Sequence, residues 1–257
     1  VQERPAMDWF EVLSENFMVA GGSPLHWLDQ LTAAYPVVPH GVSLSLGSSW
    51  DPEHRAALIR LLDRIDPPWF SDHVCFTGVP GTNTHDLLPV PYVPQVLEHM
   101  VGRAKQAMDA TGRLFLVENP SSYLSYKAST MPEHVFVAEL AERADCGILL
   151  DVNNVFVSSI NHGFDPIAYL DGLPLDRVVQ VHLAGHSVLD GFRLDTHDAP
   201  VVDAVWDLYG ETIRKLGPVS TMIERDADIP PLAELETELD AARRIAAAAL
   251  AEPATAR

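Results

Sequence analysis

Short, nearly continuous apolar runs alternate along this chain with longer stretches in which apolar residues recur at helical spacing. The helical pattern is clearest in residues 51–65, where Asp51 is a capping residue, Pro52 follows it, and apolar side chains return every three or four positions. This alternation is typical of α/β proteins. Because the short runs are apolar at successive positions, they predict parallel strands that are covered on both faces.

The pattern predicts a strand in each of the ranges 8–16, 36–44, 69–76, 113–119, 147–157, 177–185 and 220–226. It predicts a helix in each of the ranges 23–35, 51–65, 94–112, 132–145, 165–173, 199–217 and 232–250. For the helix at 23–35 we expect Ser23 to be the N-cap and Pro24 the first helical residue. Residues 77–91 are rich in Gly, Pro, Thr and Asn and predict a long surface loop, and residues 248–257 predict a frayed tail.

Seven strand–helix units are one short of a closed (β/α)8 barrel of the TIM type. We therefore expect one barrel domain over residues 1–257, with its first strand missing, or upstream of Val1, or replaced by a gap. A doubly wound open sheet is the competing architecture. No G-x-G-x-x-G sequence follows any predicted strand, so a dinucleotide-binding version of that sheet has little support.

The net charge limits the kinds of partner that we expect, and the cysteine content indicates the cellular compartment. The formal net charge is 17 − 36 = −19, which repels phosphate backbones and argues against a nucleic-acid partner. No apolar stretch is long enough to span a bilayer, so no membrane partner is expected. Cys75 and Cys146 lack a C-x-x-C arrangement and lie in or beside apolar runs, which favours buried thiols in a reducing cytoplasm.

Side chains that bind metals stand at or near the ends of the apolar runs. They are His40, His73, Glu118, Asp151, Asn154, His182 and Glu224, and a later D-T-H segment adds Asp195 and His197. A single His or Glu at a strand end is usually an ordinary hydrogen-bonded residue, but these fall at equivalent positions of several strands. The carboxyl ends of parallel strands meet on one face, so we expect them to converge there. Cations are the simplest compensation for carboxylates buried together.

The number and type of these ligands indicate more than one metal ion. A mononuclear zinc site needs three or four ligands, and this chain offers more. Ligation by nitrogen and oxygen alone suits iron, manganese or zinc and argues against a thiolate site. His186 follows His182 by four positions and is a further candidate, either supporting a ligand, facing substrate or lying in a solvated loop. Asp72 either orients the His73 imidazole or faces solvent.

The chain contains the segments "ENPSSYL" at Glu118, "LLDVNNVFV" at Leu149, "HLAGH" at His182, "DTHDAPV" at Asp195 and "IERDADIPPL" at Ile223. Together they resemble the DUF692 (UPF0276) family of multinuclear non-haem iron-dependent oxidative enzymes. The segments "SENFM", "HGVSLSLGS" and "LLPVPY" are similar to the family as well, so the resemblance covers nearly the whole chain.

The resemblance implies a (β/α)8 barrel that binds two or three iron ions and uses dioxygen to modify a ribosomally made precursor peptide, at Cys or at Asp. It also implies a small partner protein that recognises the leader peptide. By similarity, His40, His73 and Glu118 hold one iron, with Glu118 bridging, and Asp151, Asn154, His182, Asp195, His197 and Glu224 supply the others.

Two other functions stay open from the sequence. One is a hydrolase or isomerase of the xylose-isomerase-like barrel class with two or three zinc ions, since such sites also use His, Glu and Asp at strand ends. The other is a binding module without activity, for example a peptide carrier that retains a metal site. Bound iron with visible absorption would indicate oxidation, colourless stoichiometric zinc would indicate hydrolysis, and a binding module would consume no oxygen with any peptide.

Overall fold

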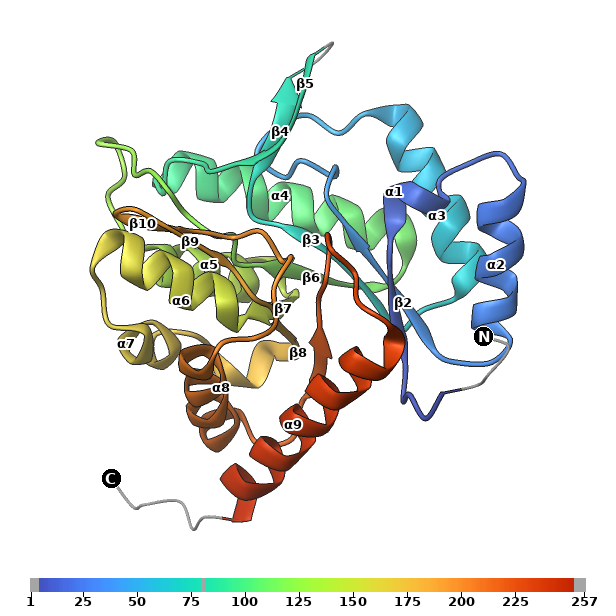
Figure 1. The fold of residues 1–257 in the computed structure, drawn as a ribbon. Coiled ribbons are helices and arrows are strands. Elements are labelled where there is room, and N and C mark those ends of the chain that lie inside the picture. The colour runs from blue at the N-terminus through green and yellow to red at the C-terminus, as the bar shows by residue number, and fades with distance from the viewer. Residues whose placement is uncertain (1–4, 80–81, 252–257) are drawn as a thin grey trace. The chain divides into compact units, whose positions relative to one another are not determined.

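The computed structural model describes residues 5–79 and 82–251 (Figure 1). These residues form two compact units. The first unit comprises Val1–Glu118 and Leu140–Gly147, and the second comprises Asn119–Glu139 and Ile148–Arg257. Each unit contains parallel strands followed by helices, which confirms the α/β prediction. The prediction of a single domain stays a prediction.

In the first unit the parallel strands follow the order β1–β2–β3–β6. Their bounds are β1 Phe10–Leu13, β2 Val37–Gly41, β3 Trp69–His73 and β6 Leu114–Glu118. Leu13 lies opposite His40, and His73 lies opposite Glu118, so the carboxyl ends of these strands are in register. Polar residues at those ends are therefore brought to one edge.

The helices of the first unit are α1 Ser14–Phe17, α2 Ser23–Thr32, α3 Pro52–Ile65 and α4 Pro94–Thr111. Leu28 of α2 and Leu61 of α3 pack with Val12 and Val37 in one apolar cluster, which fixes both helices beside the first two strands. The Asp51 side chain accepts a hydrogen bond from the Glu53 N–H and caps α3 as predicted.

Three predictions about the first unit were wrong. The strand predicted for 8–16 ends at Leu13, because α1 begins at Ser14. Gly22, not Ser23, is the N-cap of α2, and Ser23 is its first helical residue. The segment predicted as a loop at 77–91 contains the antiparallel strands β4 Phe76–Val79 and β5 Thr82–Leu88, which form a projecting hairpin in Figure 1. Residues 80 and 81 of that segment lie outside the described residues.

In the second unit the parallel strands follow the order β7–β8–β11. Their bounds are β7 Gly147–Asp151, β8 Val178–Leu183 and β11 Ser220–Ile223. Asp151 lies opposite His182, which in turn lies opposite Met222, so the carboxyl ends are again aligned. The unit also has an antiparallel pair that the pattern did not predict, β9 Ser187–Leu189 with β10 Phe192–Leu194.

The other elements of this unit are α6 Val152–His162, α7 Pro166–Asp171, the 3-10 turn η1 Leu175–Arg177, α8 Asp203–Leu216 and α9 Leu232–Ala251. Helix α5 Glu133–Ala144 spans the boundary between the units. The strand predicted for 147–157 was wrong beyond Asp151, because α6 begins at Val152. Residues 248–251 belong to α9 rather than to a frayed tail, and residues 252–257 lie outside the described part of the chain. Among the described residues, no helix is long and apolar enough to cross a membrane.

Candidate metal centre

In the first unit, His40, His73 and Glu118 form a buried group at the carboxyl ends of β2, β3 and β6. Glu118 Oε2 lies 3.2 Å from His40 Nε2 and 3.1 Å from His73 Nε2. Ligand atoms of all three residues lie within 4.8 Å of one another, which is the spacing that a shared cation needs.

The backbone and a neighbouring hydroxyl orient both imidazoles of this group. His73 Nδ1 lies 3.1 Å from the Gly41 carbonyl oxygen, which can only accept a hydrogen bond. Nδ1 therefore carries a proton, and Nε2 faces Glu118. His40 Nδ1 lies 2.8 Å from Ser71 Oγ, which leaves its Nε2 directed at Glu118 as well. This arrangement presents both Nε2 atoms as ligands.

Asp72 is buried, so the interpretation that it faces solvent was wrong, and its Oδ1 lies 3.9 Å from His73 Nδ1. Its two carboxylate oxygens accept from the backbone N–H groups of Leu44, at 2.9 Å, and His73, at 2.7 Å. Burial, and then the nearby Glu15 carboxylate, raise the pKa of Asp72 to about 7. A Cβ atom at Gly41 would lie 2.5 Å from Asp72 Oδ2, so the small residue after His40 makes room for this carboxylate.

In the second unit, Asp151, His182 and Glu224 have ligand atoms within 4.8 Å of one another. Glu224 Oε2 lies 3.0 Å from His182 Nδ1 and 3.2 Å from His197 Nδ1. His197 Nε2 lies 2.6 Å from Asp195 Oδ1 and 3.9 Å from Asp151 Oδ2. The His197 imidazole thus stands among these three carboxylates and a fourth, that of Asp226.

Two oxygen atoms of this second group, Asp151 Oδ2 and Asn154 Oδ1, are buried and have no hydrogen-bond partner among the described residues. The rest of each side chain is engaged. Asp151 Oδ1 accepts from the Asn154 N–H and caps α6, and Asn154 Nδ2 donates to the Asn119 carbonyl. Because an unsatisfied buried oxygen is costly, these two atoms fit a site that a cation completes.

The shifted pKa values in the second unit also fit a site that binds a cation. Burial raises the pKa of Asp151 to about 7. Burial would raise the pKa of Glu224 too, but His182 and His197 together lower it well below its usual value. Burial would lower the pKa of His197, yet Glu224 and Asp195 raise it well above its usual value. The group therefore concentrates negative charge that attracts positive charge.

His186 is buried rather than solvated, so its interpretation as a solvated loop residue was wrong. Its Nδ1 lies 2.8 Å from Asn153 Oδ1, and Asn153 Nδ2 donates to Asp195 Oδ1 at 2.7 Å. Sequence reasoning missed Asn153, which stands beside a candidate ligand, and Asp226, whose Oδ2 lies 3.3 Å from His197 Nδ1. Their positions, two residues from Asp151 and Glu224, were the signal that could have found them.

The chemistry of both groups fits a metal of the iron, manganese or zinc type. All donors are imidazole nitrogens or side-chain oxygens, and the buried free cysteines Cys75 and Cys146 belong to neither group. The structure thus gathers His40, His73 and Glu118 in one unit. It gathers the other candidates in the second unit, namely Asp151, Asn154, His182, Asp195, His197 and Glu224.

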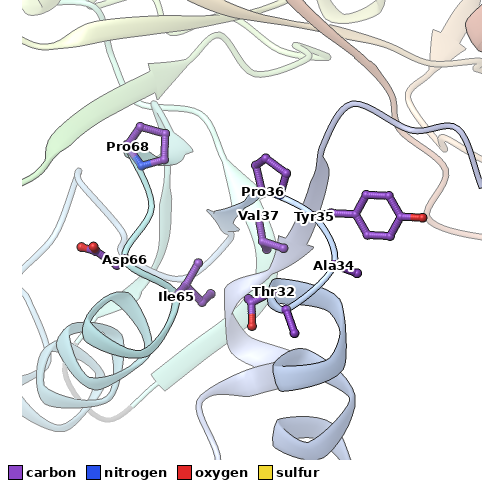
Figure 2. A pocket seen from close by; sticks show the side chains of 9 residues that line it. Thr32, Ala34, Tyr35, Pro36, Val37, Ile65, Asp66 and Pro68 are labelled. Atoms are coloured by element: carbon purple, nitrogen blue, oxygen red, sulfur yellow. The ribbon is translucent and has the colours of Figure 1, made fainter. Parts of the chain in front are cut away.

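A separate surface pocket lies at the opposite end of β2 and has no comparable cluster of histidines and carboxylates. Figure 2 shows its lining residues, Thr32, Ala33, Ala34, Tyr35, Pro36, Val37, Ile65, Asp66 and Pro68. Asp66 is the one ionisable carboxyl group in that lining, and no histidine lines it. We therefore place the candidate chemistry at the carboxyl ends of the strands and not in this pocket.

Solved structures that resemble the chain are α/β barrels. A D-tagatose 3-epimerase-like protein matches with a TM-score of 0.64 at 12% identity and covers 97% of this chain and 93% of its own. A xylose isomerase-like TIM barrel protein from Mycobacterium smegmatis, in complex with magnesium, matches with a TM-score of 0.55 at 12% identity, covering 91% and 81%. At these identities the likeness shows the fold, and it confirms the TIM-type barrel prediction.

The fold and the two buried donor groups define a class of α/β barrel proteins with candidate metal ligands at the strand ends. A family model described as "RiPP precursor modification enzyme MbnB/TglH/ChrH" matches residues 1–247. A UPF0276 protein of Caulobacter vibrioides is 52% identical over 243 residues, which is 94% of this chain and 87% of that protein. A UPF0276 protein of Anaeromyxobacter sp. is 52% identical over 250 residues, which is 96% of this chain and 88% of that protein. The chain belongs to this family of enzymes that modify precursors of ribosomally synthesised peptides, as the sequence motifs indicated.

Proposed function

We propose that this protein is a multinuclear non-haem iron enzyme that uses dioxygen to modify a ribosomally synthesised precursor peptide, at Cys or at Asp. The observation that carries the proposal is the second-unit group. There a buried carboxylate oxygen and a buried amide oxygen lie beside two histidines and have no hydrogen-bond partner among the described residues. Membership in a family of peptide-modifying enzymes supplies the substrate class.

The ligand assignment follows the two groups. His40, His73 and Glu118 would hold one iron ion. The further iron ions would use the ligands of the second unit, Asp151, Asn154, His182, Asp195, His197 and Glu224. Bound iron with open positions would supply the activation of dioxygen.

The chain itself would supply orientation and exclusion of water. The Gly41 carbonyl fixes the protonated nitrogen of His73, and Ser71 positions His40, so neither ring must reorient to bind a cation. Asn119 holds the end of β7 through reciprocal hydrogen bonds of 2.9 Å with the Asp151 backbone. His182 and Asp151 are fully buried, which keeps bulk water from them.

The partners in this proposal are the precursor peptide and a small protein that recognises its leader. The proposed compartment is the cytoplasm, where the free thiols Cys75 and Cys146 would stay reduced. Neither nucleic acid nor a membrane is part of the proposal, given the net charge of −19.

Metal analysis of protein purified without oxygen tests the proposal. We expect iron above one ion per chain, visible absorption after exposure to air, and oxygen consumption that depends on the precursor peptide. His40→Ala and Asp195→Ala should each weaken iron binding at least about 100-fold and abolish turnover, since each removes a ligand. The exposed His26→Ala and Asp190→Ala are matched controls and should behave as the wild type. Wild-type iron content in both ligand variants would refute the assignment.

The same measurements test the alternative that the protein is a hydrolase or isomerase. Its fold resembles that of an epimerase and of an epimerase-like protein. Stoichiometric zinc without visible absorption, and no oxygen consumption with peptide, would favour this alternative over oxidation.

A further inference from the structure

The β9–β10 hairpin of the second unit connects two parts of the candidate metal site. His186 directly precedes β9, and Asp195 directly follows β10. Gly191, with a φ of 87°, makes the turn between the strands. A molecule bound along this hairpin would therefore lie next to the buried group that contains Asp195.

One edge of the hairpin is already occupied. The Asn161 side chain acts as a neighbouring strand would, because its Oδ1 accepts from the Arg193 N–H at 2.8 Å and its Nδ2 donates to the Arg193 carbonyl at 3.0 Å. Arg193 thus directs both backbone groups away from β9.

The other edge is open at Val188. Val188 lies opposite Arg193 in the antiparallel register. In such a pair, when one residue directs its N–H and C=O outward, the residue opposite does the same on its own side. The Val188 backbone therefore faces away from β10. Among the described residues no group bonds to it, and the residue is 65% exposed.

Exposed apolar side chains lie on both strands of the hairpin and next to Phe192 of β10. Leu189 and Phe192 form a cross-strand pair and are 43% and 39% exposed. The Tyr123 ring, 46% exposed, lies 6.5 Å from the Phe192 ring, and its hydroxyl accepts a hydrogen bond from the Asp195 N–H at 2.9 Å. An exposed apolar patch beside an open strand edge is typical of a surface that binds an extended peptide.

We propose that the precursor peptide binds as an added strand on β9, with its backbone paired to Val188 and its apolar side chains against Leu189, Phe192 and Tyr123. This inference rests on the proposed function and adds where the substrate is held. A strand advances about 3.3 Å per residue, so a peptide paired at Val188 would need roughly two further residues to reach the level of His186. The reacting residue of a peptide bound along the hairpin would thus lie near Asp195 and His197.

The test uses iron-loaded full-length protein and a phage-displayed library of random linear peptides with one central cysteine. The best binder is then synthesised unmodified and in two N-methylated forms, one for each set of alternate residues, and its affinity is measured by fluorescence anisotropy. Since strands pair through alternate residues, we expect one methylated form to bind at least about tenfold more weakly and the other to bind like the parent. Val188→Pro, which removes the N–H, should weaken binding about tenfold, whereas Val188→Thr should not. Leu250→Ser, a loss of a similarly exposed apolar side chain at the end of α9, is the matched control and should bind like the wild type.

Several results would overturn the inference. They are no enrichment of any peptide, equal effects of the two methylated forms, unchanged affinity in Val188→Pro, or self-association of the protein that Val188→Pro abolishes. If the wild type and Val188→Pro bind iron equally well, such a result removes the hairpin proposal alone. A wild-type protein that binds no iron would instead remove the proposed function.

Discussion

At the residue scale, Asp151 shows how one side chain serves structure and candidate chemistry together. It ends β7, and its Oδ1 caps α6 through the Asn154 N–H at 2.6 Å. Its Oδ2 has no hydrogen-bond partner among the described residues and lies 3.9 Å from His197 Nε2. The hydrogen bond from the Asn154 N–H to Oδ1 therefore caps the helix and also orients Oδ2 towards His197.

Asn153 should matter for metal binding although it is not a candidate ligand. Its amide donates to Asp195 Oδ1 and accepts a bond from His186, so it holds Asp195 in place. We expect Asn153→Ala to weaken metal binding in the second unit about 10–100-fold, as the loss of a ligand's supporting bond typically does. Titration with Fe2+ under argon measures the effect.

The control for that variant is Ser159→Ala on the same helix. The Ser159 hydroxyl bonds only to the Phe156 carbonyl in the structure described, away from the candidate ligands. It should leave the metal affinity unchanged. Equal affinity of Asn153→Ala and the wild type would show that Asp195 does not depend on this amide.

At the element scale, the segment that carries Asp195 and His197 is held against the end of β8. Gly185 follows that strand, and the Ala199 and Pro200 carbonyl oxygens come so close that a Cβ atom at Gly185 would overlap the first and lie 2.5 Å from the second. The absence of a side chain at Gly185 therefore lets this segment approach His182.

Gly185→Ala should displace the segment 195–200, because a backbone carbonyl cannot move aside as a flexible side chain can. We expect a loss of about 1–3 kcal/mol in the free energy of unfolding and weaker metal binding in the second unit. Urea denaturation and Fe2+ titration measure both. Gly210→Ala in α8 is the control, since its Cβ would make an ordinary contact with Ile245 at 3.6 Å, and it should be neutral or stabilise by up to about 1 kcal/mol. A fully stable Gly185→Ala variant with normal metal affinity would contradict this account.

At the scale of the whole molecule, each unit buries ionisable groups whose charge must be balanced. The first unit buries His40, His73, Asp72 and Glu118, and the second buries Asp151, His182 and His197. Such burial is unfavourable without compensation, so the metal-free protein should be less stable than the loaded one. The shifted pKa values give this cost a definite dependence on pH.

The metal-free protein should melt at lower temperature as the pH rises from about 5 to about 8. Folding raises the pKa of Asp151 and of Asp72 from 3.8 to about 7 through burial, so the stability linked to their protons is lost as the pH rises through 7. The raised pKa of His197 acts in the same direction, while the lowered pKa of Glu224 acts only below 4.5. Differential scanning fluorimetry at several pH values measures the trend.

Two comparisons make that experiment decisive. Asp151→Asn should flatten the profile because it removes one titrating group, whereas Asp190→Asn at an exposed position should not. Added Fe2+ should also flatten it, because a bound cation keeps the carboxylates ionised. A melting temperature that rises with pH in the metal-free protein would mean that these carboxyl groups are not held as described.

The sequence by itself determined the alternation of strands and helices and the residues that stand at the strand ends. Both are local properties, since apolar periodicity and capping residues such as Asp51 act within a few positions of the chain. The change from β7 to α6 at Val152 escaped that reasoning. Residues 152–157 are rich in valine, which favours strands. However, the Asp151 carboxylate caps a helix there, and the first residues of that helix are buried in the fold.

Only the tertiary structure decided how the candidate ligands are grouped and aimed. Neither spacing nor composition could show that the Gly41 carbonyl selects the protonated nitrogen of His73, or that Asn153 supports Asp195. The β9–β10 hairpin was missed for the same reason. Its strands are three residues each, and the Asn161 side chain that closes one edge comes from a different element. Polar atoms choose partners by distance in space and not along the chain, so these choices emerge only when the fold brings remote residues together.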